Sequence, residues 1–201
     1  LGTVMDENFP AVALIQNEVP RHPVRVYQGD GIGVFTAEIQ FEKEQDIAFG
    51  STVLEWFRVG GFDQLIIIDG ILAPEKQIQG EGLFAVGANE SARDRLKSLD
   101  LQTIQRGIVS GITGFLLSEG DRLNLDITAL LSEASPMYPD VRAAAVAIEA
   151  ITEMTGKEIP LSAMLENARS IEQSVQEIIE SATPLLPSPE DDDTINDPSF
   201  G

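Results

Sequence analysis

The sequence predicts an α/β fold in which strands alternate with helices around a mainly parallel sheet, and three observations support this. Residues 65–68 form a continuous apolar run that Asp69 and Gly70 close, as expected of a strand covered by helices on both faces. Residues 107–114 place glycines where a strand would turn into a helix, and Asp140 precedes an alanine-rich helical stretch. Such alternation is typical of strand–helix–strand units.

The first part of the chain is expected to be β-structure. Short apolar runs at residues 11–15, 24–27 and 34–41 are predicted as strands. The last two are joined by a Gly-Asp-Gly turn at residues 29–31, whose members tolerate positive φ, so we expect a hairpin. With Gly33 the turn superficially resembles a dinucleotide-binding loop, but such a loop needs a following helix. A β-run follows here, and the hairpin is therefore favoured.

The middle of the chain is expected to alternate between helices and strands. Asp46 would cap its first helix, and two consecutive glycines after Val59 would end it. The predicted elements are, in order, a helix over residues 47–59, strands at 65–68 and 83–86, a helix over 91–99 that Ser91 caps, and a weak strand at 101–104.

The glycine-rich stretch opens the second half of the domain. It is interpreted as a strand, a tight turn and the start of a helix that ends near Gly120. Three further elements are predicted after it: a strand at residues 125–131, a helix from Asp140 to a stop at Gly156, and a last helix over 161–182.

The chain is strongly acidic, with 33 Asp and Glu residues against 13 Lys and Arg residues and a net charge of −20. Such a surface repels phosphate backbones and anionic lipids, so neither nucleic acid nor a membrane is an expected partner. No apolar run approaches the roughly 18 residues needed to cross a bilayer, and we expect a cytoplasmic protein. The absence of cysteine excludes thiol nucleophiles and cysteine-ligated metals.

No residue pattern identifies a catalytic residue, a metal site or a resident cofactor. His22 is the only histidine, and it lies between Pro20 and Pro23, away from any serine or carboxylate motif. Pairs of carboxylates are expected by chance in so acidic a chain and do not by themselves indicate a shared cleft.

The turn at residues 107–114 is the better candidate for binding an anion. Glycines at a strand-to-helix turn let backbone N–H groups approach a ligand, and here Ser110, Gly111 and Thr113 would form the site. No Lys or Arg occurs within residues 107–121 to balance a phosphate. The alternative is that the glycines permit close packing of backbone against backbone.

The predicted last helix carries a narrow apolar stripe with the period of a coiled coil. Its members follow one another at steps of three and four residues: Leu161, Met164, Ala168, Ile171, Val175, Ile178 and Ala182. Either the stripe packs on the chain's own sheet, or it forms a contact between subunits in which Ile171, Val175 and Ile178 take part.

Residues 184–201 are expected to lie outside the fold, which leaves residues 1–183 as a single α/β domain. Three prolines and a run of acidic residues predict a disordered acidic tail that cannot bury apolar area. The tail ends in Phe200 and Gly201. These residues are interpreted either as an aromatic anchor for a partner or as an inert, solubilising terminus.

Several segments, taken in order, match a known family. The most specific is Gly-Ile-Val-Ser-Gly-Ile-Thr-Gly-Phe-Leu-Leu at residues 107–117, and the others lie at residues 9–12, 23–27, 60–70, 130–134 and 138–156. In this order, over about residues 9–182, the sequence resembles the PAC2 family, the archaeal proteasome assembly chaperone family. That family usually begins with a strand and a glycine-rich turn into a helix. This chain has no such segment, which suggests that its N-terminus is truncated.

The resemblance implies a three-layer α/β sandwich similar to the phosphorylase-like folds. It also implies a homo-oligomer that acts as a non-enzymatic chaperone or adaptor on proteasome core-particle α subunits or their assembly intermediates, without a cofactor. Some such proteins end in a hydrophobic residue, a tyrosine and a final residue, whereas Ser199 and Phe200 stand here. The alternative is a small-molecule enzyme, a nucleotide-dependent ligase or a nucleoside-processing protein, that uses the turn at residues 107–114 as an anion site.

Overall fold

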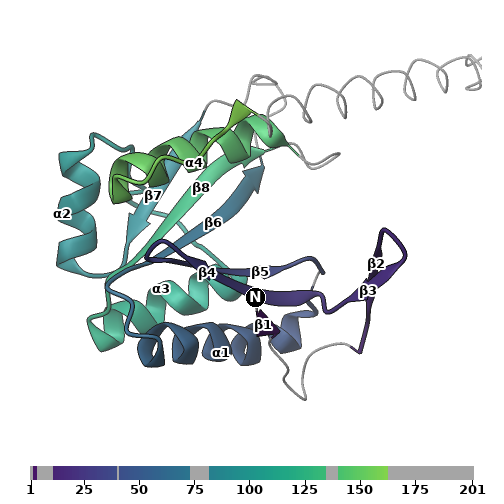
Figure 1. The fold of residues 1–201 in the computed structure, drawn as a ribbon. Coiled ribbons are helices and arrows are strands. Elements are labelled where there is room, and N and C mark those ends of the chain that lie inside the picture. The colour runs from purple at the N-terminus through teal and green to yellow at the C-terminus, as the bar shows by residue number, and fades with distance from the viewer. Residues whose placement is uncertain (1, 4–10, 40, 73–81, 135–139, 163–201) are drawn as a thin grey trace, which may run out of the picture.

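The computed structural model describes residues 2–3, 11–39, 41–72, 82–134 and 140–162 (Figure 1). The fold is mixed α/β. The described part contains two antiparallel β-units near the N-terminus, followed by a mixed three-stranded sheet with α-helices.

The N-terminal β-structure has two separate units. Strands β1 (Gly2–Thr3), β4 (Val24–Gly29) and β5 (Ile32–Ala37) form one antiparallel sheet with β4 in the centre. Strands β2 (Leu14–Gln16) and β3 (Val19–Arg21) form a hairpin of their own, where sequence reasoning had placed a single strand.

The predicted Gly-Asp-Gly hairpin is confirmed. Gly29 pairs with Ile32, so the turn consists of Asp30 and Gly31, whose φ values of 51° and 76° are both positive. Positive φ at both central residues suits the twist of a two-residue hairpin. Strand β5 ends at Ala37, earlier than the predicted residue 41, and a short 3₁₀ helix (Lys43–Gln45) follows.

The second sheet has the order β6 (Leu65–Leu72), β8 (Ile127–Ala134), β7 (Leu83–Gly87). Strands β6 and β8 are parallel, whereas β7 is antiparallel to β8. The prediction of a mainly parallel sheet therefore needs correction to a mixed sheet. The reason is length: only residues 73–82 separate β6 from β7, and a crossover to a parallel strand needs about a dozen residues or more, usually with a helix.

Helices cover both faces of β8. On one face, Ile127, Ala129 and Leu131 share a core cluster with residues of α1 (Asp46–Val59) and α3 (Gly111–Leu123). On the other face, Leu130 packs with Leu96 of α2 (Glu90–Ser98) and with Ala150 of α4 (Val141–Thr155). Figure 1 shows α1 and α3 on one side of this sheet and α4 on the other. The strand buried on both faces is thus β8, while the predicted β6 is an edge strand with Ile68 51% exposed.

Three of the predicted helix ends are wrong by one to three residues. Asp46 does not cap α1 but is its first residue, after the N-cap Gln45. Helix α2 is capped by the Asn89 side chain, which accepts a hydrogen bond of 2.9 Å from the Ala92 N–H, rather than by Ser91. Helix α3 continues past Gly120 to Leu123 and ends at Asn124, whose φ is 53°. A Cβ at Gly120 would lie 2.8 Å from that of Ala88, so this glycine is needed for close packing rather than for a stop.

The predicted ends of α4 agree with the structure. Asp140 caps α4 by accepting a hydrogen bond from the Ala143 N–H, and α4 ends at Gly156 with a φ of 65°. The weak strand expected at residues 101–104 is present only as an isolated bridge between Ala85 and Thr103.

Aromatic rings join the N-terminal sheet to the helices. The ring of Phe35 on β5 lies 5.4 Å from that of Phe49 and 5.5 Å from that of Trp56, both on α1. At the hairpin turn, the Lys157 ammonium donates a hydrogen bond of 2.7 Å to the Asp30 carbonyl. The β4–β5 hairpin is therefore held to α1 and to the chain just after α4.

Candidate functional surfaces

The residues of the predicted anion turn meet at the start of α3. Ser110 is the N-cap residue, but its side chain makes no capping hydrogen bond. Gly111 follows with a φ of 68°, a conformation that favours glycine. Thr113 is buried, and its hydroxyl donates a hydrogen bond of 2.6 Å to the carboxylate of Asp69, which lies within β6. The predicted turn and helix are present, without a strand at residues 107–110.

Two carboxylates lie beside this turn. The Asp69 carboxylate accepts the hydrogen bond of the Thr113 hydroxyl, and a Cβ placed on Gly111 would lie 3.7 Å from an oxygen of Asp46. Negative side chains near a helix N-terminus are stabilised by its dipole and repel a further anion. A Cβ on Gly114 would lie 2.3 Å from the Val109 carbonyl oxygen, which shows how closely the backbone packs here. These contacts favour the packing interpretation of the glycines.

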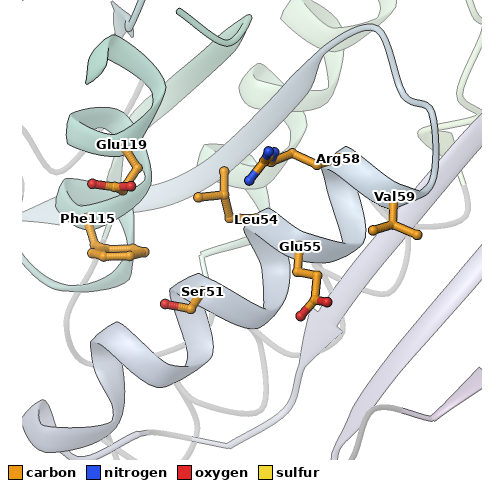
Figure 2. Close-up of a pocket in the computed structure, with 7 residues that line it drawn as sticks. All are labelled: Ser51, Leu54, Glu55, Arg58, Val59, Phe115 and Glu119. Atoms are coloured by element: carbon orange, nitrogen blue, oxygen red, sulfur yellow. The ribbon is translucent and has the colours of Figure 1, made fainter. Parts of the chain in front are cut away.

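A groove of about 500 Å³ runs along the outer surface between α1 and α3 (Figure 2). The helices approach closely because Gly50 has no side chain: a Cβ there would lie 2.4 Å from the Phe115 ring. Two of the residues that line the groove come from α3 and five from α1, and they are Phe115 and Glu119, and Ser51, Leu54, Glu55, Arg58 and Val59.

Glu119, which lines this groove, forms an ion pair with Arg122 of the same helix. The Arg122 guanidinium donates two hydrogen bonds to the Glu119 carboxylate, and this holds the pKa of Glu119 below its ordinary value. The same contact raises the pKa of Arg122. A carboxylate held ionised near neutral pH cannot donate a proton as a general acid. Glu119 is therefore not a candidate general acid in this groove.

The single histidine has a local structural contact. His22 Nδ1 lies 3.1 Å from the Val24 carbonyl oxygen and 3.3 Å from the Val24 backbone nitrogen, so the imidazole bonds to the Val24 backbone in either tautomer. Among the described residues, no group of three or more His, Asp or Glu side chains could hold a metal ion. No helix in the same residues is long and apolar enough to span a membrane.

Exposed apolar side chains gather in the N-terminal β-structure, a feature that sequence reasoning missed. Five of the ten large apolar side chains exposed in the described residues belong to residues 11–37. They are Val12, which precedes β2, Ile15 and Val19 of the β2–β3 hairpin, and Tyr27 and Val34 of the β4–β5 hairpin. A signal was present in the sequence: this segment has two acidic and two basic residues in a chain whose net charge is −20.

Two predicted contacts lie outside the described residues. One is the subunit contact at Ile171, Val175 and Ile178, and the other is the C-terminal anchor at Phe200 and Gly201.

Comparison with protein families gives a match over most of the chain. The family model of the PAC2 family matches residues 1–179. An uncharacterized protein of Methanocaldococcus jannaschii is 23% identical over 185 residues, which cover 86% of this chain and 70% of that protein.

Comparison with solved structures gives the same fold. Pyrococcus furiosus PbaA, described as an archaeal homolog of proteasome-assembly chaperone, matches with a TM-score of 0.79 and 24% identity over 91% of this chain and 76% of PbaA. Pyrococcus furiosus PbaB, described as an archaeal proteasome activator, matches with a TM-score of 0.68 and 23% identity over 86% of this chain and 78% of PbaB. A Thermoplasma acidophilum protein of unknown function matches with a TM-score of 0.74 and 21% identity over 92% of this chain and 76% of that protein.

Proposed function

The chain belongs to the PAC2 family, and we propose that it acts as a proteasome assembly chaperone or a proteasome-binding adaptor, through protein contacts and without catalysis. The observation that carries the proposal is the family match over residues 1–179. The fold shared with PbaA and PbaB supports it, because these two proteins are described as a homolog of a proteasome-assembly chaperone and as a proteasome activator.

The proposed partners are proteasome core-particle α subunits or their assembly intermediates, together with other copies of this chain in the cytoplasm. The acidic surface supports a contact with basic regions of a partner, because complementary charges steer and orient association. The carboxylates beside Gly111 and the ion-paired Glu119 support a role without catalysis.

We also propose a layer arrangement for the domain and two contacts with partners. Helices on both faces of β8 fit a three-layer sandwich of the phosphorylase-like type, with residues 1–183 as one domain and 184–201 as a disordered acidic tail. We propose that Ile171, Val175 and Ile178 contribute to contacts between subunits. Phe200 would act as an aromatic anchor, whose single weak contacts add up in an oligomer.

Binding to purified proteasome core particles tests the function. The intact chain is expected to bind, and both a version that ends at Pro189 and Phe200→Ala are expected to bind more weakly with unchanged oligomer mass. Equal affinities for all three would eliminate the anchor. Failure of the intact chain to bind either core particles or separate α subunits would overturn the proposed function.

The subunit contact is tested separately by light scattering. Ile171→Asp and Val175→Asp are expected to lower the oligomer mass, whereas the matched control Gln173→Asp, outside the apolar stripe, is expected to leave it unchanged. An oligomer mass that none of the three variants alters would exclude this segment from the contact.

A panel of nucleotides and inorganic phosphate tests the enzyme alternative by thermal shift. A ligand at 100 times its dissociation constant would stabilise the fold by about 2.7 kcal/mol. We expect no shift, because two carboxylates flank the turn at Ser110, Gly111 and Thr113. A shift that Thr113→Val abolishes would restore the anion site.

A further inference from the structure

A second groove, of about 660 Å³, lies at the C-terminal end of α4. Figure 1 shows this helix on the opposite side of the mixed sheet from α1 and α3, so the groove belongs to a different face of the molecule from the one between those two helices. Three residues of α4 and four of the chain after it line this single groove: Glu149, Thr152, Glu153, Glu158, Ile159, Pro160 and Leu161.

The helix and the chain that follows it form the two walls of this groove. Glu149, Thr152 and Glu153 share one face of α4, because residues three and four apart in a helix are neighbours. The other face of α4 packs on the mixed sheet. Gly156 ends the helix with a φ of 65°, and residues 158–161 then supply the second wall.

The α4 groove presents carboxylates and apolar side chains. The Thr152 hydroxyl donates a hydrogen bond of 3.0 Å to the Ile148 carbonyl, so it is already bonded within the helix. Within the part of the chain that the structure describes, none of the three lining glutamates forms an ion pair. The ammonium of Lys157, which is close in sequence, donates its hydrogen bond to the Asp30 carbonyl. The groove therefore has negative charge without a cation to balance it.

The position of these carboxylates is unfavourable for α4 itself. Glu149 and Glu153 are four residues apart on the helix, where like charges repel one another. Glu153 also lies in the last turn, which contains no basic residue. The C-terminal end of a helix carries a partial negative charge that favours cations and disfavours carboxylates. A positive charge in this groove would be attracted both by the glutamates and by the end of the helix.

The same features restrict what can occupy the groove. The described residues contain no group of three or more acidic or histidine side chains that could hold a metal ion. A second copy of this chain, with a net charge of −20, would be repelled by the glutamates. Lys and Arg side chains combine an apolar stem with a charged end, and so they suit a groove with both carboxylates and apolar walls.

We propose that the α4 groove binds a basic segment of a partner protein, in which Lys or Arg side chains stand beside apolar ones. The cations pair with Glu149, Glu153 and Glu158, and the apolar side chains lie on Ile159 and Leu161. The proposal rests on the proposed function, which assigns basic regions of a partner to the acidic surface, and it names the part of that surface that binds. Because charges contribute to the contact, added salt weakens it.

Two triple variants with the same change in net charge test the groove. The groove variant carries Glu149→Gln, Glu153→Gln and Glu158→Gln. The control variant carries substitutions at three exposed glutamates outside the groove, namely Glu44→Gln, Glu55→Gln and Glu90→Gln. The probe is the peptide Lys-Leu-Lys-Leu-Lys, and its affinity is measured by titration calorimetry. The groove variant is expected to bind it about tenfold more weakly than the wild type, as the loss of three exposed ion pairs implies. The control variant is expected to bind it almost as tightly as the wild type.

Two further measurements separate groove binding from unfolding and from attraction by net charge. In thermal unfolding, the groove variant is expected to be at least as stable as the wild type, because its substitutions remove repulsion within α4. The peptide Lys-Ser-Lys-Ser-Lys has the same charge as the first probe but no apolar side chains beside its lysines. The wild type is expected to bind it more weakly, because it cannot cover the apolar wall.

Each outcome supports or overturns the proposal. A wild-type chain that does not bind the leucine peptide overturns it, as do equal affinities of the two triple variants for that peptide. Equal affinities of the wild type for the two peptides also overturn it, since net charge alone would then explain binding. Core-particle binding by the wild type is measured separately and tests the proposed function. If the wild type binds core particles, the groove variant is expected to bind them more weakly than the control variant, and equal binding would overturn the proposal while the proposed function stands.

Discussion

Strand β8 and the β2–β3 hairpin lie in the same chain but depend on different interactions. The first six residues of β8 are buried, and the strand is paired with β6 on one side and β7 on the other. The hairpin strands pair only with one another in the described residues, and their side chains are largely exposed. Packing therefore determines the stability of β8, whereas turn geometry and backbone pairing determine that of the hairpin.

The largest difference is expected from truncating one apolar side chain in each region. Leu130→Ala removes a fully buried side chain that contacts both α2 and α4 residues, and it should destabilise the chain by about 2–5 kcal/mol. Ile15→Ala should change stability by no more than about 0.5 kcal/mol. Urea unfolding at a concentration where the chain is monomeric measures both. Similar losses would show that the hairpin is packed in solution.

Adding a methyl group at the edge of the mixed sheet and at the β4–β5 hairpin provides the next test. A Cβ on Gly87, at the end of β7, would lie 2.7 Å from the Arg93 backbone nitrogen, so Gly87→Ala forces strand and helix apart. Overpacking of this kind costs about 1–3 kcal/mol. Gly29→Ala places its methyl group in open space with an ordinary φ, and it is expected to be neutral or slightly stabilising. A neutral Gly87→Ala would mean that α2 moves freely against the sheet.

Elements with local signals were predictable from the sequence. The β4–β5 hairpin follows from a turn in which both central residues tolerate positive φ, and α4 follows from Asp140 and Gly156 at its two ends. Gly120 shows where local reasoning fails, because its contact with Ala88 arises only after β7 and α3 have packed together. The position of β7 beside β8 depends on pairing across residues 83–132, which no local pattern encodes.

The turn at residues 107–114 and the exposed β2–β3 hairpin also differ in how much of each the sequence predicts. The spacing of the glycines predicts that Ser110, Gly111 and Thr113 lie at the start of a helix. It does not predict the hydrogen bond from Thr113 to Asp69, because these two residues come from elements far apart in the sequence. The exposed β2–β3 hairpin could not be predicted without two facts that a run of residues does not give. One is that β2 pairs with β3 instead of joining a larger sheet, and the other is that Ile15 and Val19 remain exposed.

A smaller effect is expected from the turn of the β2–β3 hairpin. Glu18 has a φ of 64°, a conformation that disfavours residues with a side chain. Glu18→Gly removes this strain but adds freedom to the unfolded chain, so it should stabilise the hairpin by only about 0.5 kcal/mol. Hydrogen exchange of the β2 and β3 amides should slow, while exchange in β8 stays unchanged. Faster exchange in the hairpin would show that the turn is not strained.

The smallest effect is expected from the exposed pair between Arg122 and Glu119 on α3. Hydrogen bonds from Arg122 hold the pKa of Glu119 below its ordinary value of 4.5. A lowered pKa in the folded state means that the pair stabilises the fold above about pH 4.5, and that this contribution is lost as pH falls through the lower folded value. In an NMR titration, Arg122→Gln should raise the pKa of Glu119 toward 4.5, with little change in the unfolding midpoint at neutral pH because the pair is exposed. A large loss of stability would show that this surface ion pair matters as much as the buried core. An unchanged Glu119 titration would show that Arg122 does not bind this carboxylate in solution.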